Sequence, residues 1–175
     1  MSKAVERPAN PSDIESIEAI IAAAYDSISG PAGKKRDWDR MRSLFISGAR
    51  LIPTAVDAGR NDVDLAAGRV RPNGGLAPQM LDIEGFIARA EQAFEKTGFY
   101  EKEVARRVER FGQIAHVWST YESRHDPSDP VPFMRGINSI QLFNDGSRWW
   151  ILSIYWQHEG SGHMIPAKYF ESAKD

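Results

Sequence analysis

Apolar residues recur along this chain at two spacings, every third or fourth position in several segments of the first hundred residues and every second position in the last third. The first spacing gathers apolar side chains on one side of a helix, and the second gathers them on one face of a strand. The helical spacing predicts three helices: one from Ser12 to Gly30, one from Asp37 to Gly48 and one over residues 82–96. Ser12 opens a Ser-x-x-Glu capping box, and the glycines supply stop signals.

The alternating spacing predicts a sheet. Its last two strands are joined by Asn144-Asp145-Gly146-Ser147, a sequence typical of tight hairpins because Asp-Gly tolerates positive φ angles. Pro53 places an earlier, short strand at a sheet edge or a bend, since proline cannot donate a ladder hydrogen bond. The expected strands are 49–56, 99–111, 113–122, 133–144 and 148–157. This order of elements favours an α+β fold, in which three helices pack on one face of a strongly bent, mainly antiparallel sheet.

Composition divides the chain into three parts. Residues 1–11, polar and interrupted by two prolines, are expected to form a flexible arm, and residues 12–158 a single folded domain. Residues 159–175 are expected to pack on the domain surface as a tail. Inside the domain, residues 57–79 are rich in Gly, Asn, Asp and Pro and predict a long loop, a lid or pocket wall, with a short strand over 65–71.

Charge and composition exclude several classes of partner. The 175 residues carry a formal net charge of −2, which gives no electrostatic reason to expect nucleic acid or an anionic membrane. The basic run at 34–36 is expected in a solvated loop. No apolar run approaches the roughly 20 residues of a membrane helix, and the first residues contain no signal-peptide core, so a cytoplasmic location is expected. The chain has no cysteine, and its four histidines lack metal-ligand spacing, so neither a metal nor another cofactor is expected.

Alternation also sorts the strand residues into two faces. One face mixes small, polar and aromatic side chains, which is typical of a ligand pocket. Its members are Ala115, Val117, Ser119, Tyr121, Arg135, Ile137, Ser139, Gln141, Trp149, Ile151, Ser153 and Tyr155. The other face is largely apolar and is expected to form a homodimer interface. Its members are His116, Trp118, Thr120, Asn138, Ile140, Leu142, Trp150, Leu152, Ile154 and Trp156. The reverse assignment stays open, because a bulge at Gly112 or Gly136 would turn a strand over.

Four stretches carry a family resemblance. They are Asp37-Trp38-Asp39-Arg40 and residues 111–121, 135–142 and 145–151. Together they resemble the NTF2-like superfamily, which includes nuclear transport factor 2, SnoaL-like cyclases, ketosteroid isomerase and scytalone dehydratase. The likeness runs from about residue 12 to 157, and the chain looks most similar to the uncharacterised bacterial members. It implies a cystatin-like cone of one bent sheet and three helices, often as a homodimer, but no particular reaction.

Tyr25, Asp26 and His116 are the candidate catalytic residues. The Tyr25-Asp26 pair is similar to a Tyr-Asp pair of scytalone dehydratase, which works with two sheet histidines. His116 is the one histidine inside an expected strand here, and its register does not match the family. The alternative is a structural role for all three, with Tyr25 packing its helix on the sheet. Because no complete catalytic set is recognised, a cofactor-independent lyase or isomerase is an alternative to ligand binding.

The favoured function is binding of a small apolar or carboxylated molecule inside the cone. Arg135 is the leading anchor, because a guanidinium can hold a carboxylate with two hydrogen bonds. Its alternative is a salt bridge with a neighbouring glutamate, namely Glu101, Glu103 or Glu109. The other expected ligand-binding residues are Trp38, Phe86, Ser119, Tyr121, Ser139, Gln141, Ser153 and Tyr155. A structural dimerisation module is a third possibility, and it predicts a cone filled by side chains with no cavity.

Overall fold

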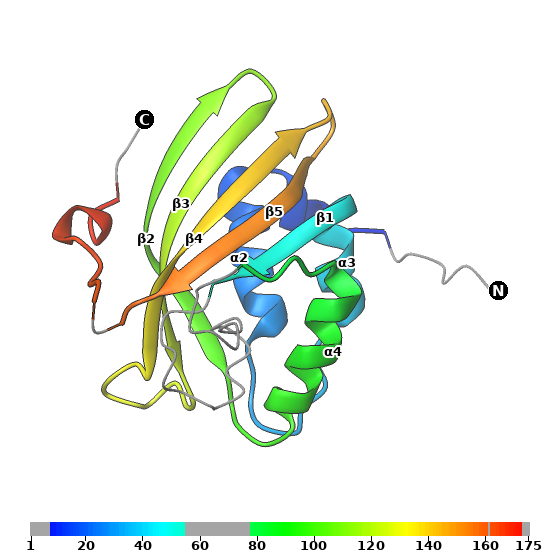
Figure 1. The fold of residues 1–175 in the computed structure, drawn as a ribbon. Coiled ribbons are helices and arrows are strands. Elements are labelled where there is room, and N and C mark those ends of the chain that lie inside the picture. The colour runs from blue at the N-terminus through cyan, green and yellow to red at the C-terminus, as the bar shows by residue number, and fades with distance from the viewer. Residues whose placement is uncertain (1–7, 55–77, 161, 173–175) are drawn as a thin grey trace.

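The computed structural model describes residues 8–54, 78–160 and 162–172. Within them, one curled five-stranded sheet packs against a layer of helices, in strand order β1-β5-β4-β3-β2 (Figure 1). β1 runs parallel to β5, and the other neighbouring strands are antiparallel. The strands are β1 Phe45–Pro53, β2 Tyr100–Phe111, β3 Ile114–Arg124, β4 Met134–Asn144 and β5 Trp149–His158. The expected α+β fold with a bent, mainly antiparallel sheet is confirmed.

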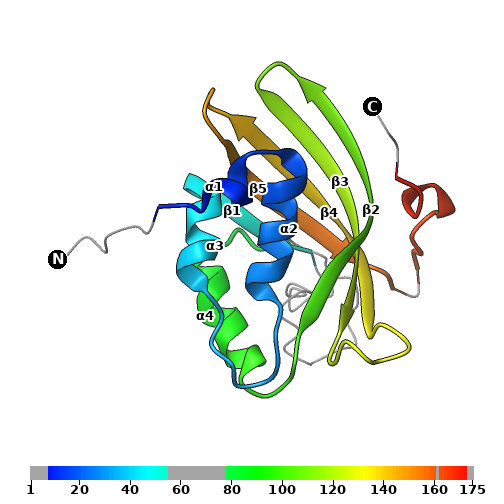
Figure 2. The same ribbon diagram turned by 180° about the vertical axis from the view of Figure 1, so that it is seen from behind.

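The helices lie together on the concave face of this sheet (Figure 2). They are α1 Pro11–Ile14, α2 Ile17–Ile28, α3 Trp38–Leu44 and α4 Ile83–Phe94, and a short 3-10 helix, η1 Ala167–Tyr169, follows the last strand. The helix expected from Ser12 is divided in two, because the Ser16 side chain accepts a hydrogen bond from the Ala19 amide and begins α2. The expected capping box at Ser12 is therefore wrong; Asn10 caps α1.

The two later helices begin where their caps predict. The Asp37 side chain accepts from the Arg40 amide at 3.0 Å, and the Asp82 side chain accepts from the Gly85 amide at 2.8 Å. α3 ends earlier than expected, since Phe45 already belongs to β1. β1 is an edge strand, as Pro53 indicates. The expected strand at 65–71 and most of the loop expected at 57–79 lie outside the described residues.

Strand pairing corrects the predicted facing of β4. Directly paired residues of an antiparallel ladder share a face, and the buried Ser119 of β3 pairs with Asn138. The concave face of β4 therefore holds Gly136, Asn138, Ile140 and Leu142. Arg135, Ser139 and Gln141 lie on the outer face instead, as does Ile137. The true concave set of β4 is thus shifted by one residue from the predicted set.

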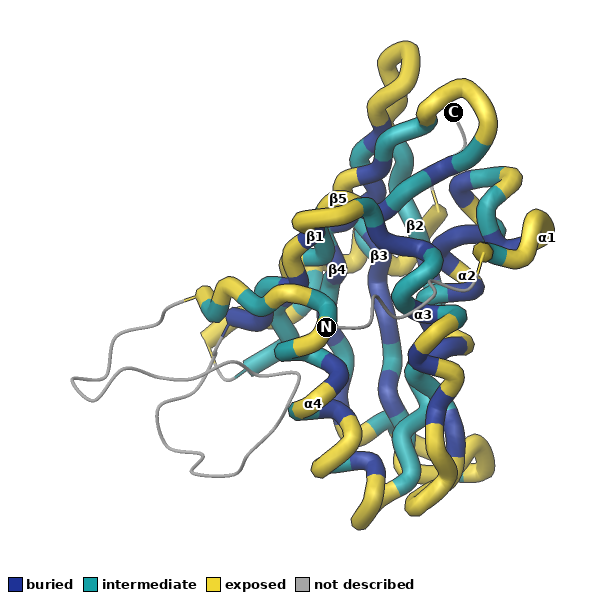
Figure 3. Tube along the Cα trace, turned by 90° about the vertical axis from the view of Figure 1, so that its right-hand side faces the viewer, coloured by how far each residue is buried: buried dark blue, intermediate teal, exposed yellow. Residues whose placement is uncertain are grey.

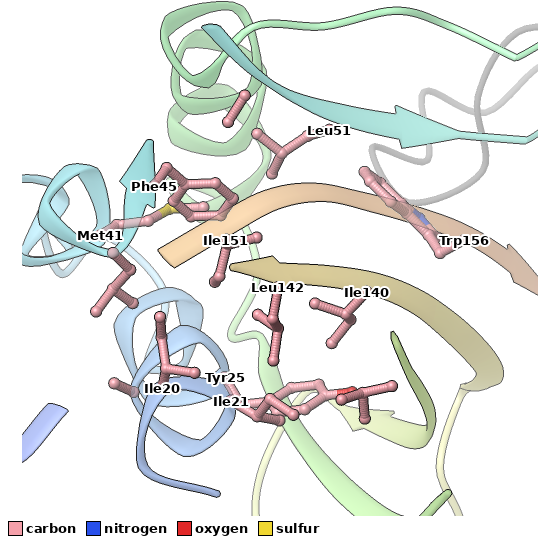
Figure 4. Packing of buried hydrophobic residues seen from close by; sticks show 14 of the residues in the cluster. Ile20, Ile21, Tyr25, Met41, Phe45, Leu51, Ile140, Leu142, Ile151 and Trp156 are labelled. Atoms are coloured by element: carbon pink, nitrogen blue, oxygen red, sulfur yellow. The ribbon is translucent and has the colours of Figure 1, made fainter. Parts of the chain in front are cut away.

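A bulge corrects the second half of β5. Gln141 pairs with Ser153 and Leu142 with Ile151, which leaves Leu152 as an extra residue on β5. Trp149 and Ile151 face the helices, as expected from alternation, but Trp156 returns to the same concave side (Figure 4). Ser153 and Tyr155 are therefore turned outward, and Tyr155 is 44% exposed.

These corrections place the large apolar residues of the sheet in the core. Ile140, Leu142 and Trp156 join Ile20 and Ile21 of α2 in one cluster between sheet and helices. In Figure 3 the buried positions concentrate on the central strands and on the helix sides that face them. The apolar outer face expected for a homodimer therefore loses these residues, and the homodimer stays a prediction.

Arg36 is the main exception to the expected solvated loop at 34–36. Its side chain is only 6% exposed, and its guanidinium lies over the ring of Phe94, 4.9 Å from the ring centre. The guanidinium donates to four backbone carbonyls, those of Ile28, Gly30, Pro31 and Lys34. Burial lowers the pKa of this arginine from its ordinary value. The basic residue thus closes the end of α2.

The tail beyond β5 lies on the outer side of the sheet (Figure 1). Thr120 Oγ1 donates to the Tyr169 carbonyl at 2.6 Å, and the Arg107 guanidinium donates to the Lys168 carbonyl at 2.9 Å. These contacts hold the described part of the tail against β2 and β3, and the division into an arm, a domain at 12–158 and a tail stays a prediction. No helix in the described part of the chain is long and apolar enough to cross a membrane.

Candidate functional site

A cavity of about 430 Å³ lies between the concave face of the sheet and the helices. Phe86 and Ala90 of α4 form one wall, and Tyr25 of α2 forms another. The sheet supplies the opposite side, where Ile140 and Trp156 are the large apolar residues. The cavity arises because α2 and α4 approach the curled sheet from two sides and their small residues leave the centre unfilled.

The walls are mostly aromatic and aliphatic. The rings of Phe86 from α4 and Trp156 from β5 meet edge to face with their centres 6.2 Å apart. A helix and a strand thus share this part of the cavity wall. Phe94 and Phe99 stack 4.9 Å apart, centre to centre, nearer the far end of α4. A surface of this kind favours an apolar ligand, because burying apolar area releases water from both partners.

One end of the cavity is polar. Asn138 Nδ2 donates to Tyr25 Oη at 2.9 Å, and Tyr25 Oη lies 2.7 Å from Ser119 Oγ. Ser119 Oγ in turn donates to Glu103 Oε1 at 2.6 Å. The Arg106 guanidinium holds the other oxygen of Glu103 with an Nε–Oε2 distance of 2.8 Å. These five residues, here called the polar chain, connect the cavity to the Glu103–Arg106 ion pair of β2, which lies on the same side of the sheet.

Tyr25 is a neutral phenol in this setting. Burial, reinforced by the charge of Glu101, raises its pKa far above the ordinary value. The hydrogen bonds from its neighbours act in the opposite sense but do not outweigh burial. Tyr25 therefore offers a fixed hydroxyl and not a phenolate base.

Two titratable side chains also line the cavity. Glu101 lines it, and Glu101 Oε2 accepts from Ser123 Oγ at 2.8 Å. His125 also lines it; its ring stacks on Phe133 with centres 4.0 Å apart, and its Nδ1 lies 3.1 Å from the Gly98 carbonyl. Neither was among the expected site residues.

Four of the expected ligand-binding residues belong to this region. Phe86 and Tyr121 line the cavity. Ser119 does not line it but is hydrogen-bonded to Tyr25, which does. Trp38 lies one layer behind, stacked on Phe94 at a centre distance of 6.3 Å. Their roles in binding stay predictions.

The other five expected ligand-binding residues do not line the cavity. Arg135, Ser139, Gln141, Ser153 and Tyr155 are all on the outer side of the sheet, for the reasons of register and bulge given above. Arg135 forms a salt bridge, which is the alternative role expected for it, but its partner is Glu159 of the tail at 3.0 Å and not one of the three expected glutamates. Ser139 and Tyr155 border a separate hollow of about 440 Å³ beneath the tail.

The three candidate catalytic residues are not brought together. Tyr25 faces the cavity, whereas Asp26 is exposed and pairs with Arg40. His116 lies on the outer face of β3, where its Nε2 is 2.9 Å from Ser139 Oγ. Tyr25 and His116 lie on opposite sides of the sheet, so neither can transfer a proton directly to the other.

Asn138, Glu103 and Arg106 are the members of the polar chain that sequence reasoning missed. Alternation in β4 predicts Asn138 on the outer face, and Glu103 is expected only as one of three possible partners of Arg135. A signal for Asn138 is its position two residues before the apolar pair Ile140 and Leu142, since same-face positions recur every second residue. Glu103 carries no such signal, because a register shift lies between Glu103 and Ala105.

No protein-family model matches the chain, and none of the curated proteins does. Solved structures match its fold. A protein of unknown function with a cystatin-like fold from Nostoc punctiforme has a TM-score of 0.57 at 12% identity, covering 83% of this chain and 90% of that one. A putative scytalone dehydratase from Novosphingobium aromaticivorans has a TM-score of 0.54 at 11% identity, covering 87% and 89%. An NTF-2-like protein of unknown function from Silicibacter pomeroyi has a TM-score of 0.51 at 16% identity, covering 83% and 94%.

These likenesses define the class of fold. The chain has the NTF2-like, cystatin-like architecture, as the resemblance of its sequence implied. At these identities the similarity speaks for the fold alone, so function has to be argued from the cavity.

Proposed function

We propose that this protein binds a small, uncharged and mainly apolar molecule in the cavity between sheet and helices. The observation that carries the proposal is the cavity itself, with apolar walls and one polar end. Its volume of about 430 Å³ falls within the range of roughly 300–1,000 Å³ that is usual for small-molecule sites. A purely structural module would instead fill this space with side chains.

The charge of the lining favours a neutral ligand over a carboxylated one. Among the described residues that line the cavity there is no lysine or arginine, and Glu101 contributes a carboxylate. A second carboxylate would meet this charge in a largely apolar space, where like charges repel strongly. Arg135, the anchor expected for an acidic ligand, is on the other side of the sheet.

Filling the cavity is expected to weaken binding of an apolar probe strongly. Ala90 of α4 is 1% exposed and lines the cavity, so Ala90→Phe places a ring in the space that a ligand would take. Titration with the neutral fluorescent dye N-phenyl-1-naphthylamine should give a dissociation constant at least about tenfold higher than for the unchanged protein, the equivalent of roughly 1.4 kcal/mol.

Ala88→Phe is the matched control, because Ala88 is an exposed residue of the same helix. It should leave dye binding unchanged. Circular dichroism should show both variants folded. Equal dye affinity in a folded Ala90→Phe variant would show that the dye binds elsewhere and would remove the main support for the proposal.

A cofactor-independent lyase or isomerase is a second candidate. It is supported by the two titratable side chains that line the cavity, Glu101 and His125, which could act as base and acid. The candidates expected from the sequence, Tyr25, Asp26 and His116, are too separated for this role.

Removing the carboxylate of Glu101 tests the catalytic candidate. The unchanged protein, incubated with a metabolite extract, should deplete one compound and form an isomer or a product lacking one water, detected by mass spectrometry. Glu101→Gln should slow this by roughly 10²–10⁴-fold, the usual contribution of a general base. Dye binding should persist in the variant. No depletion by the unchanged protein, or equal depletion by both, would remove Glu101 from a catalytic role.

A further inference from the structure

The hydrogen bonds of the polar chain run in one direction, and Glu103 sets that direction. Arg106 donates to Glu103 Oε2, and a carboxylate paired with a guanidinium can only accept. The 2.6 Å contact between Ser119 Oγ and Glu103 Oε1 therefore uses the one hydroxyl proton of Ser119. Ser119 then has only lone pairs left for its other neighbour.

That constraint passes to the next two residues. Because Ser119 cannot donate twice, the phenol proton of Tyr25 points to Ser119 Oγ, 2.7 Å away. Tyr25 Oη must accept from Asn138, which places the amide nitrogen of Asn138 at this 2.9 Å contact. The orientation of the Asn138 amide, which spacing alone would leave ambiguous, is thus determined by a carboxylate three hydrogen bonds away.

The amide oxygen of Asn138 is the atom left for a ligand. Asn138 lines the cavity and is 7% exposed, and no described residue donates to its Oδ1. Glu101 also lines the cavity, and its carboxylate can accept hydrogen bonds but not donate them. Neither Asn138 Oδ1 nor Glu101 supplies a donor to a ligand.

We propose that the cavity selects an apolar molecule bearing a hydrogen-bond donor, a hydroxyl or N–H group, which donates to Asn138 Oδ1. This inference rests on the proposed binding function and names the chemical class of its ligand. Glu103 is a positioning residue in this scheme: it touches no ligand, but it orients three successive hydrogen bonds so that an acceptor faces the cavity.

Changing the carboxylate to an amide should reverse the chain. In Glu103→Gln, Arg106 can only donate and so holds the new amide oxygen, which turns the new NH₂ group toward Ser119. Ser119 Oγ then accepts from this NH₂ group and donates its own hydroxyl hydrogen to Tyr25 Oη, and Tyr25 donates to the amide oxygen of Asn138. The Asn138 amide turns over and presents its NH₂ group to the cavity.

Two matched probes read this polarity by isothermal titration calorimetry. 2-Naphthol carries a hydroxyl donor, and 2-methoxynaphthalene has the same ring with an acceptor only. The unchanged protein should bind 2-naphthol roughly tenfold more tightly, the usual value of one hydrogen bond to a buried acceptor. In Glu103→Gln the ratio of the two affinities should fall to about twofold or less, because the NH₂ group of Asn138 can then donate to the ether oxygen of 2-methoxynaphthalene. Glu109→Gln, an exposed change on the same strand, should keep the original ratio.

The possible outcomes separate this inference from the function on which it rests. If the unchanged protein binds both probes equally, the donor preference is wrong while binding in the cavity stands. If it binds neither, the proposed function fails as well. A preference that survives unchanged in folded Glu103→Gln would overturn the role of Glu103. Asn138→Leu supplies a second test should Glu103→Gln not fold: it removes the acceptor, and the preference for 2-naphthol should disappear.

Discussion

Arg36→Met is expected to lower the free energy of unfolding by about 3 kcal/mol or more. The substitution keeps a long side chain against Phe94 but removes every donor that the guanidinium offers to backbone carbonyls. A buried carbonyl that loses its partner costs roughly 1–3 kcal/mol, and several lose theirs at once here. Urea unfolding followed by circular dichroism measures the change.

Lys35→Met is the control, because Lys35 is the exposed neighbour in the same basic run. Exposed substitutions usually stay within about 0.5 kcal/mol, so this variant should unfold near the midpoint of the unchanged protein. Coincident urea midpoints for the two variants would mean that the carbonyls at the end of α2 are satisfied without Arg36.

Gly136→Ala is expected to destabilise the fold and to damage the cavity together. A Cβ atom at this position would lie 2.4 Å from Tyr121 Oη and 2.6 Å from the Gln157 carbonyl oxygen. The carbonyl belongs to the neighbouring strand β5 and cannot retreat without loosening the β4–β5 ladder. Overpacking of this kind costs about 1–3 kcal/mol. Thermal unfolding should show the loss, and the displaced Tyr121 should weaken dye binding.

Gly162→Ala provides the comparison, since nothing lies within 4 Å of a Cβ added there. Its melting temperature and dye affinity should match those of the unchanged protein. If Gly136→Ala had the same melting temperature and dye affinity as Gly162→Ala, Tyr121 could not lie as close to Gly136 as the structure shows.

Much of the fold could be predicted from the sequence because it depends on local signals. Asp37 and Asp82 act within their own first helical turns, and Asp145-Gly146 forms its own hairpin turn, with Gly146 at a φ of 99°. The favoured facing of β3 agrees with the structure, because Ala115, Val117, Ser119 and Tyr121 recur at every second position and all are buried. Such features require no knowledge of the neighbouring strands.

The parts that failed depend on partners distant in sequence. The loop between β3 and β4 leaves the register open, so only pairing places Asn138, and not Arg135 or Ser139, on the concave face. The bulge at Leu152 reverses the second half of β5 for the same reason. Arg36 looks like a surface residue in its own sequence, and its burial becomes visible only with the end of α2 and Phe94 in place.

The candidate site shows the same division. Phe86 and Tyr121 were predictable from apolar periodicity, whereas the polar chain joins residues of α2, β2, β3 and β4. The direction of its hydrogen bonds follows from the ion pair of Glu103 with Arg106, which the sequence pattern of β2 does not predict.

A crystal structure of the full chain with 2-naphthol tests the central claim most directly. Binding in the cavity predicts density for the naphthalene ring against Phe86 and Ile140, with the hydroxyl oxygen about 3 Å or less from Asn138 Oδ1. A cavity closed by the protein's own side chains, or a probe bound only at another surface, would contradict it.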